Sequence, residues 1–308
     1  VHLRPLFGNL SIEAQQQAIA PLSGVEAGDQ KIVLATNIAE TSLTIEGVDV
    51  VVDSGLAREA TFTPATGMTG LRTVKISQAS SVQRAGRAGR LRPGKCYRLW
   101  SESQQQQLVP QTPAEILKAD LAPLALQLLQ WGVNDPSELP WLDPPPKGSW
   151  GQAMDLLQML GAVSKVQEQW GLTDHGQLMT QLPVHPRLAH CLIFGGAIGQ
   201  ETLASQLASL LSDRDPFSRE HPEVNYRLEI VRGERSSPKQ NQGWLYRTQQ
   251  LVQQFERSLH GLKTSSQQVI PLLKQDQQIA YLLACAYPDR IARRRHSGGY
   301  QLSNGRSA

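Results

Sequence analysis

Residues 31–36 read Lys-Ile-Val-Leu-Ala-Thr, and this short apolar run decides the fold class. Runs of this kind are typical of strands buried on both faces of a parallel sheet. Two similar runs follow at 48–53 and 95–100, and helical patterns intervene at about 12–20 and 79–90. This alternation predicts an α/β domain in which helices cover both faces of a parallel sheet.

The pattern changes in the stretch after the second of these strands. Two strand-like segments, Arg58–Thr63 and Leu71–Ile76, flank Pro64-Ala65-Thr66-Gly67, which favours a turn. We therefore predict a β-hairpin that protrudes from the sheet. An ordinary connection between sheet elements is the alternative.

Helical patterns dominate the second half of the chain. An apolar stripe at helical spacing covers residues 115–131, a second helix is predicted at 150–160, and residues 163–172 fit a small hairpin. Helix, helix and hairpin in this order are typical of a winged-helix module, which either binds nucleic acid or only packs. Further helical segments predict an α-helical bundle; they cover residues 188–198, 203–211, 243–259 and 266–286.

The candidate functional site is the arginine segment, residues 83–90, which reads Gln-Arg-Ala-Gly-Arg-Ala-Gly-Arg. Arg84, Arg87 and Arg90 recur every third residue, so a helix would carry them along one stripe. Each of the two intervening glycines costs about 1 kcal/mol relative to Ala inside a helix, which indicates that a ligand approaches the backbone closely. Because Arg binds anionic oxygens bidentately and keeps its charge, the segment suits a polyphosphate.

Two structural interpretations compete with this one. Arginines at this spacing also occur on solvated helices, although a solvated helix would favour Ala at residues 86 and 89. Ser80 and Gln83 fit a capping box, with Ser80 as N-cap and Gln83 at N3. Gln83 would then have a purely structural role.

Composition and charge are those of a folded protein with an anionic partner. The 308 residues are 40% hydrophobic and 19% charged, with a net charge of +3. Residues 72–98 contain eight basic side chains and no acidic one, which predicts a local basic patch, and a second run comprises Arg290 and residues 293–295. The three cysteines lack ligand spacing, so we expect neither a disulfide framework nor a metal site. No apolar run is long enough to span a membrane.

Three segments in a fixed order carry a family resemblance. They are Pro5-Leu6-Phe7-Gly8-Asn9-Leu10, the segment from Ala35 to Ile45, and the arginine segment leading into Pro93-Gly94-Lys95. Together they resemble motifs IV, V and VI of the DEAH-box family of superfamily 2 helicases. Three downstream segments, at 141–146, 182–188 and 287–294, are similar to the helicase-associated region of its bacterial HrpB branch.

The resemblance implies four successive parts. In this family two RecA-like domains clamp one nucleotide and one nucleic-acid strand, and the chain resembles the second of them. The expected parts are a RecA-like α/β domain at 1–111, a winged-helix module at 112–180, a helical bundle at 181–287 and the start of an incomplete β domain at 288–308. We expect the chain to be an internal piece of a longer protein.

The resemblance also implies nucleotide-binding residues. Arg87 and Arg90 match arginines that reach the γ-phosphate, one of them as an arginine finger. Gln83 matches a glutamine that helps to position the phosphate and the attacking water. Thr44 and Glu46 match positions near the ribose and the metal-bound phosphates, with a plain surface acid as the alternative for Glu46.

A second set of residues is implied to touch the nucleic-acid backbone, and comprises Gly8, Asn9, Thr36 and Asn37. Short polar side chains and exposed N–H groups suit phosphate contacts that do not depend on sequence. A strand-end turn is the alternative for Thr36 and Asn37. The predicted hairpin at 56–76 matches an element near the duplex junction and is a candidate wedge.

The implied activity is that of an ATP-dependent RNA helicase, which couples NTP hydrolysis to translocation on RNA or its unwinding. ATP or another NTP, with Mg²⁺, would bind mainly to the first RecA-like domain, because the sequence contains neither a P-loop nor a DEAH quartet. The isolated chain is therefore not expected to hydrolyse ATP. Expected partners are that first domain and single-stranded RNA, or a duplex with a 3′ overhang, in the cytoplasm and without a membrane. A non-catalytic nucleic-acid-binding or interaction module that keeps the helicase fold is the alternative.

Overall fold

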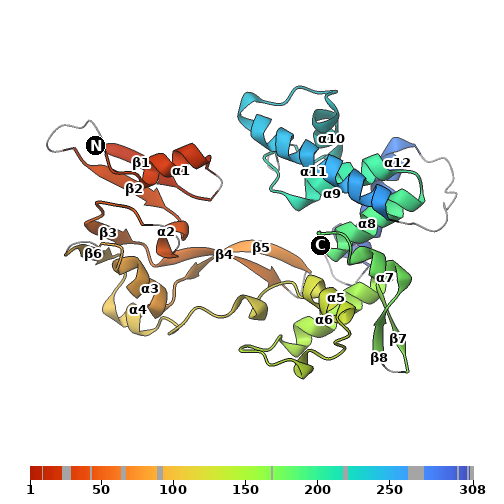
Figure 1. Ribbon diagram of the computed structural model, residues 1–308, viewed down its shortest axis with the longest axis horizontal. Coiled ribbons are helices and arrows are strands. Elements are labelled where there is room, and N and C mark those ends of the chain that lie inside the picture. Colours follow the sequence, from red (N-terminus) through yellow and green to blue (C-terminus); the bar gives the residue numbers. More distant parts are fainter. Residues whose placement is uncertain are drawn as a thin grey trace. The chain divides into compact units, whose positions relative to one another are not determined.

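The protein is described by a computed structural model in which two compact units are distinguished, Val1–Ala119 and Asp120–Ala308 (Figure 1). Each unit is considered by itself. The described residues are 1–8, 10–22, 29–41, 44–63, 67–88, 93–167, 169–217, 221–262, 274–296, 298–303 and 305.

The first unit contains two parallel strand pairs. Strand β1 (His2–Leu6) pairs with β2 (Lys31–Ala35), and β3 (Val50–Asp53) pairs with β6 (Lys95–Arg98). The strands that the sequence predicts at 31–36, 48–53 and 95–100 are thus confirmed. The sequence did not predict β1, because Pro5 and two basic residues interrupt its apolar pattern.

Helices contact these strands, but apolar side chains stay exposed on them. Helix α1 (Ile12–Ile19) packs against β1 and α3 (Gln78–Ala85) against β3. Leu3 is opposite Ile32 in the parallel register, so the two side chains lie on the same face of the strand pair. Exposed apolar residues on the strands are Leu3, Ile32, Leu34, Val50, Val52 and Tyr97. Covering of both sheet faces by helices therefore stays a prediction.

The predicted β-hairpin is confirmed. Strands β4 (Leu56–Thr63) and β5 (Met68–Lys75) pair in antiparallel register over their full lengths (Figure 1). A small core of Ala57, Ile76 and Leu108 is buried at the base of the hairpin. Two short helices lie elsewhere in this unit: α2 (Ile38–Thr41) follows β2, and α4 (Glu102–Gln106) follows β6.

The first unit extends further along the chain than the domain boundary expected at residue 111. The backbone N–H of Phe62 donates to the Lys118 carbonyl at 2.9 Å, and the Lys118 ammonium pairs with Glu59. These contacts hold the segment after residue 111 against the hairpin, so the compact unit ends at Ala119.

The second unit begins with two helices and a hairpin, in the order that the sequence predicts. They are α5 (Ala122–Gln130), α6 (Lys147–Met159), β7 (Val163–Val166) paired with β8 (Gln169–Leu172), and then α7 (Asp174–Met179). The predicted helix at 115–131 is wrong over its first part, where only a 3-10 turn forms at Glu115–Leu117. Pro123 lies in the first turn of α5, where a missing N–H is tolerated, and a proline is unfavourable deeper inside a helix.

Five longer helices make up most of the rest of this unit, and α8 and α9 contact each other closely. An added Cβ on Gly195 would lie 2.3 Å from the Ala204 side chain, so a glycine allows this approach. The predicted helix at 266–286 is confirmed from Gln275 onward, and its first part lies outside the described residues. The helices are α8 (Pro186–Ala197), α9 (Glu201–Ser212), α10 (Val224–Arg232), α11 (Gln242–Gly261) and α12 (Gln275–Ala286); 3-10 turns occur at Pro136–Glu138, Lys239–Asn241 and Pro288–Arg290.

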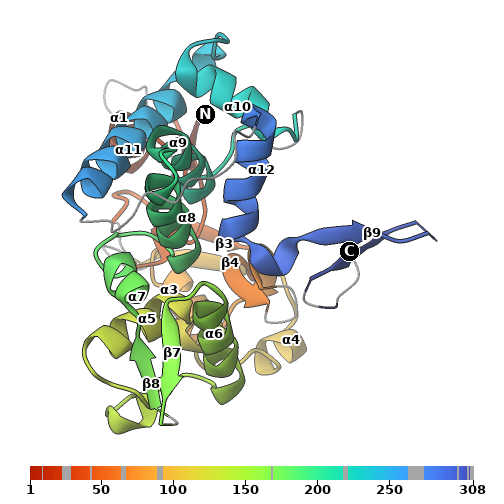
Figure 2. The same ribbon diagram turned by 90° about the vertical axis from the view of Figure 1, so that its right-hand side faces the viewer.

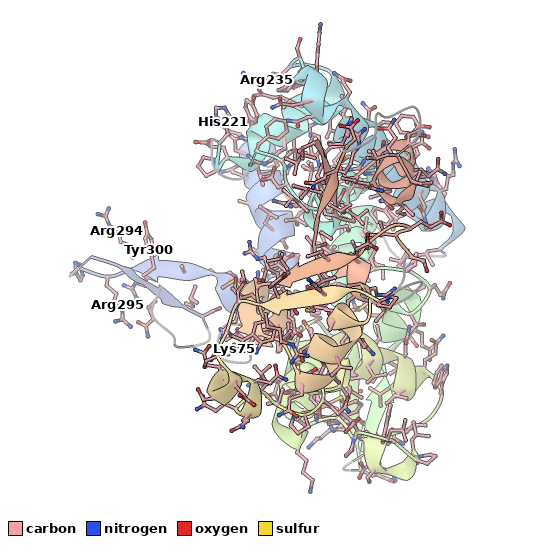
Figure 3. The ribbon with its side chains drawn as sticks, turned by 90° about the vertical axis from the view of Figure 1, so that its left-hand side faces the viewer. Lys75, His221, Arg235, Arg294, Arg295 and Tyr300 are labelled. Atoms are coloured by element: carbon pink, nitrogen blue, oxygen red, sulfur yellow. The ribbon has the colours of Figure 1, made fainter. Side chains whose placement is uncertain are left out.

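A short hairpin follows α12. Strand β9 (Ala292–Arg294) pairs with β10 (Tyr300–Leu302), which confirms part of the strand predicted after residue 299 (Figure 2). Arg294 is opposite Tyr300 in register, and both lie on one side of the hairpin while Arg295 lies on the other (Figure 3). Residues 293–295 of the second basic run are therefore exposed on this hairpin, whereas Arg290 precedes it and is partly buried.

Candidate functional site

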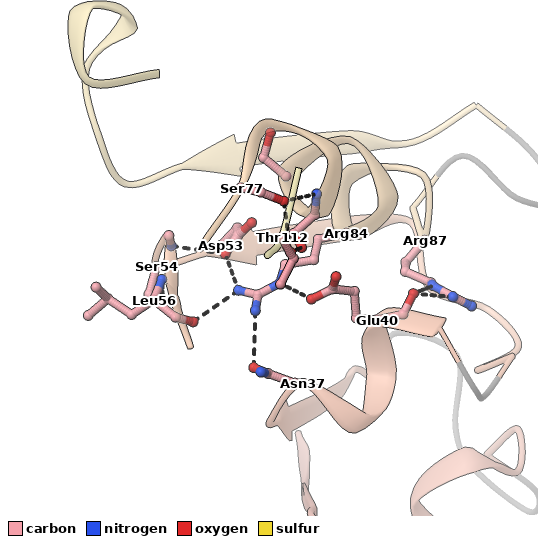
Figure 4. Close-up of polar contacts among 12 residues, drawn as sticks. Asn37, Glu40, Asp53, Ser54, Leu56, Ser77, Arg84, Arg87 and Thr112 are labelled. Carbon is pink, nitrogen blue, oxygen red and sulfur yellow. Dashed lines mark hydrogen bonds and ion pairs between the residues drawn. The ribbon is translucent and has the colours of Figure 1, made fainter. Parts of the chain in front are cut away.

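The helix that carries the arginine segment begins earlier than the sequence indicates. Ser77 is the N-cap of α3, and its Oγ accepts a hydrogen bond from the Ser80 N–H at 3.1 Å. The prediction of Ser80 as N-cap is wrong, because Ser77 already ends the extended chain and caps the first turn. Thr112 supports this cap, with its Oγ1 at 3.1 Å from the Ser77 Oγ (Figure 4).

The same helix also ends within the arginine segment. Its last residue is Ala85, and Gly86 is the C-cap with helical φ and ψ of −63° and −9°. The predicted single helical stripe of arginines is therefore wrong, because Arg87 lies in the turn after α3. Arg90 lies outside the described residues. Arg84 and Arg87 thus occupy different local structures despite the regular spacing of the segment.

Arg84 is held at the centre of a polar network (Figure 4). Its side chain is only 14% exposed. Nε donates to Glu40 Oε2 at 3.0 Å, and Nη2 donates to Asn37 Oδ1 at 3.1 Å. Nη1 donates to Asp53 Oδ1 at 3.0 Å and to the Leu56 carbonyl at 3.1 Å. The guanidinium group therefore joins α3 to α2, to the end of β3 and to the start of β4.

Asp53 is the most deeply buried acid of this network, and its side chain is 3% exposed. Its Oδ1 also accepts a hydrogen bond from the Gly55 N–H at 3.0 Å. One guanidinium group thus faces two carboxylates, those of Asp53 and Glu40. Arg84 supplies the positive charge that compensates the burial of these carboxylates.

Arg87 contacts the same short helix, α2, as Arg84, but through a different atom of Glu40. Its Nε donates to the main-chain carbonyl of Glu40 at 2.8 Å, and its Nη2 contacts the same oxygen (Figure 4). The side chain is partly buried. Glu40 therefore binds Arg84 through its carboxylate and Arg87 through its backbone.

Three further residues predicted for the nucleotide are not among the described partners of Arg84 and Arg87. Gln83, Thr44 and Glu46 are all exposed. They lie in α3 and in the segment that precedes β3, respectively. Their exposed side chains leave them accessible to a ligand, and their roles stay predictions.

The residues predicted to touch nucleic acid lie at one edge of the first strand pair. β1 and β2 end together, with Leu6 opposite Ala35, and the Thr36 N–H donates to the Leu6 carbonyl at 3.1 Å. Gly8, Thr36 and Asn37 follow directly and are exposed. Asn9 lies outside the described residues. The carboxyl edge of a parallel sheet is a common place for ligands.

Sequence reasoning missed the two acids of the network. Glu40 and Asp53 lie 44 and 31 residues from Arg84. Asp53 directly follows an apolar strand, which is a signal for a residue at the functional edge of a sheet. Nothing in the spacing connected either acid with an arginine.

Other kinds of site receive no support from the part of the chain that the structure describes. Burial raises the pKa of the Cys96 thiol, so this cysteine is protonated near neutral pH and does not act as a nucleophile. Among the described residues no three His, Cys, Asp or Glu side chains are grouped to hold a metal ion. No described helix has both the length and the apolar character needed to cross a membrane.

Comparison with known families gives one match to the first unit. Residues 1–92 match the family described as helicase conserved C-terminal domain. This match includes the arginine segment, α2 and Asp53.

Curated proteins of similar sequence are RNA helicases by name. The chain is 42% identical to the ATP-dependent RNA helicase HrpB of Escherichia coli over 309 aligned residues, which cover all of this chain and 34% of HrpB. It is 40% identical to the probable ATP-dependent RNA helicase DHX34 of Mus musculus, over 70% of this chain and 18% of the relative. The pre-mRNA-splicing factor ATP-dependent RNA helicase prp22 of Schizosaccharomyces pombe is 38% identical, with the same coverage of 70% and 18%.

Two solved structures have the same fold over nearly the whole chain. The crystal structure of the E. coli DExH-box NTPase HrpB matches with a TM-score of 0.78 and 40% identity, over 99% of this chain and 34% of that one. The crystal structure of the E. coli DEAH/RHA helicase HrpB matches with a TM-score of 0.80 and 40% identity, over 100% and 36%. The chain thus spans about a third of the length of these relatives.

Proposed function

We propose that the chain forms the second motor domain and adjoining modules of an ATP-dependent RNA helicase, because it belongs to the HrpB branch of the DEAH-box helicase family. The complete protein couples NTP hydrolysis to translocation on RNA or its unwinding. One observation carries this proposal: the arginine segment is bonded to the segment after β2, through Arg84 with Asn37 and Arg87 with Glu40. Residues proposed for the nucleotide and for RNA are therefore adjacent.

The nucleotide side of the proposal assigns roles to the arginine segment. Arg87 and Arg90 reach the γ-phosphate, and one of them acts as an arginine finger, which is worth about 10³ to 10⁵ in rate. Gln83 positions the phosphate and the attacking water. Thr44 and Glu46 contact the metal-bound phosphates and the ribose. The exposure of Gln83, Thr44 and Glu46 supports these assignments, since a ligand has access to them.

The residues of this chain fit one wall of a nucleotide site. A Cβ added to Gly86 would meet its nearest neighbours at 3.5 Å, so protein atoms do not crowd the turn that carries Arg87. Hydrolysis of ATP or another NTP, bound with Mg²⁺, supplies the free energy for movement along RNA. The groups that hold most of that nucleotide belong to the first RecA-like domain, because this chain has no P-loop.

The nucleic-acid side of the proposal uses the edge at which β1 and β2 end. Gly8, Asn9, Thr36 and Asn37 contact the backbone of single-stranded RNA, or of the 3′ overhang of a duplex. Exposed polar groups at this edge support contacts that do not read the sequence. The hairpin β4–β5 acts as a wedge near the duplex junction.

The second unit contributes accessory modules. Of the winged-helix module proposed for 112–180, residues 120–180 lie in this unit; a helical bundle that guides the RNA covers 181–287, and residues 288–308 begin a further β domain. The order of α5, α6 and the β7–β8 hairpin supports the first of these. The proposal includes a cytoplasmic location and no membrane partner.

The test is hydrolysis by a protein that contains this chain together with the first RecA-like domain. We expect Arg87→Ala and Arg90→Ala to abolish RNA-stimulated NTP hydrolysis while the far-UV CD spectrum is unchanged. Lys147→Ala, which removes an exposed basic side chain from α6, is the control and retains turnover. Wild-type turnover in both test variants would overturn the proposal. RNA binding by a wild-type protein that lacks any hydrolysis would favour the non-catalytic module.

A further inference from the structure

We infer that Arg84 is a positioning residue that couples the nucleotide-binding arginines to the RNA-contacting segment after β2. This inference rests on the proposed function. It gives Arg84 a role different from that of Arg87 and Arg90, although all three arginines have the same spacing in the sequence.

The contacts of Arg84 exclude it from direct nucleotide binding in this conformation. Each of its three nitrogens donates to a protein oxygen at 3.0–3.1 Å, and the side chain is 14% exposed. To reach a phosphate, the guanidinium group would have to leave Asp53, a buried carboxylate with no other cation among the contacts described here. Breaking a buried pair in this way costs about 3–5 kcal/mol.

The planar shape of the guanidinium group makes the contacts of Arg84 a rigid joint. Its donors are arranged in a fixed fork, so acceptors bound at Nε, Nη1 and Nη2 keep a constant mutual orientation. These acceptors belong to α2, to the end of β3 and to Asn37. A shift of α3 therefore moves α2 and Asn37 with it. A lysine at this position would keep the charge but has a single nitrogen.

Glu40 connects this joint to the arginine that is proposed to bind nucleotide. Its carbonyl accepts from Arg87, while its carboxylate accepts from Arg84. When Arg87 turns toward a phosphate, it has to give up the bond to this carbonyl. The bond from Arg84 persists, so α2 stays attached to α3 and follows any movement that nucleotide binding imposes on the arginine segment.

The contacts of Arg84 fix the orientation of the Asn37 side chain. Its Oδ1 accepts from Arg84, so the opposite end of the amide, which carries the two N–H donors, points away from the guanidinium group. The side chain is exposed at the strand edge where RNA is proposed to bind. Arg84 thus fixes which end of the amide a phosphate or sugar oxygen meets.

The experiment measures coupling rather than turnover alone. In a protein that contains both RecA-like domains, NTP hydrolysis is measured without RNA and with saturating single-stranded poly(U). We expect Arg84→Lys to leave hydrolysis without RNA nearly unchanged, to lower the RNA-stimulation ratio about tenfold, and to raise the poly(U) concentration needed for half-maximal stimulation. Lys147→Arg makes the reverse exchange of basic side chains at an exposed site on α6, to which no role is assigned, and keeps the wild-type ratio.

A second variant changes an acceptor of Arg84 instead of Arg84 itself. Glu40→Gln removes the carboxylate that Arg84 Nε contacts and leaves the carbonyl that Arg87 contacts. It should lower the stimulation ratio in the same direction. In the double variant with Arg84→Lys the two effects should be less than multiplicative, because both act on one contact.

The outcomes separate this inference from the proposed function. A wild-type protein without RNA-stimulated hydrolysis refutes the proposed function itself. If the wild type is stimulated, an unchanged ratio in Arg84→Lys overturns the inference, and so does an equal loss of basal and stimulated hydrolysis. If Arg84→Lys fails to fold, Glu40→Gln decides, and a wild-type ratio in that variant overturns the inference.

Discussion

Arg84 Nη1 lies 3.0 Å from Oδ1 of Asp53, and this ion pair joins the last turn of α3 to the end of β3. The two residues are 31 positions apart in the chain. Since the Asp53 side chain is almost fully buried, removing the arginine opposite would leave a buried carboxylate without its charged partner.

Removing the charge of Arg84 should therefore destabilise the protein. We expect Arg84→Met to lower the free energy of unfolding by about 3–5 kcal/mol, because a buried carboxylate loses its partner. Urea unfolding followed by circular dichroism measures this change. Arg257→Met, at an exposed position on α11, is the control and should change stability by about 0.5 kcal/mol or less. A similar small effect for Arg84→Met would contradict the structural role of the pair.

Gly94 should not tolerate any side chain. A Cβ at this position would lie 2.1 Å from the Ala88 carbonyl oxygen and 2.7 Å from that of Asp49, and backbone atoms cannot move aside cheaply. We expect Gly94→Ala to cost about 3 kcal/mol of stability, as for severe overpacking. Gly70→Ala, on β5 with no atom within 4 Å of the added Cβ, is the matched control. Equal midpoints of thermal unfolding for the two variants would show that the close approach is not maintained.

Gly86 provides a test of ligand approach that is independent of folding. Its φ of −63° is accessible to alanine, and an added Cβ would meet only ordinary contacts at 3.5 Å. We expect Gly86→Ala to change stability by about 0.5 kcal/mol or less. In the complete protein it should raise the KM for NTP, because the methyl group would stand where a polyphosphate approaches the turn. Unchanged NTP kinetics would mean that this glycine does not serve the ligand.

A histidine pair in the second unit makes stability depend on pH. His175 Nε2 and His190 Nδ1 are 2.8 Å apart, and burial lowers the pKa of His190 to about 4, with a further contribution from His175. Between the ordinary pKa of about 6.5 and this value the unfolded chain binds more protons than the folded one. Stability should therefore be fully present above pH 6.5 and fall by about 2–3 kcal/mol as the pH decreases toward 4.

The pH prediction is checked by urea unfolding at several pH values in that window. His190→Gln removes the titrating group and should reduce the slope of stability against pH, whatever its effect on stability itself. His260→Gln, at an exposed position on α11, should keep the wild-type slope. A slope that is the same in His190→Gln as in the wild type would show that other groups cause the acid sensitivity.

Local signals in the sequence accounted for most of the elements. Short apolar runs predicted the strands β2, β3 and β6. Two strand-like segments on either side of Pro64-Ala65-Thr66-Gly67 predicted the β4–β5 hairpin. Boundaries were less predictable where two residues compete for one role. Ser77 and Ser80 are both good N-caps, and only the course of the preceding chain decides that Ser77 caps α3.

The sequence alone determined the α/β character of the first unit, the hairpin and the family motifs, because these depend on periodicity and on short contiguous segments. Residue type and spacing did not distinguish Arg84 from Arg87, and the family resemblance assigned a role to Arg87 but none to Arg84. Tertiary structure decided their contacts by bringing Asp53 and the Glu40 carboxylate to one guanidinium group and a backbone carbonyl to the other. The physical reason is that the energy of a charged side chain depends on which charges and dipoles surround it, and residues 31 and 44 positions away supply them.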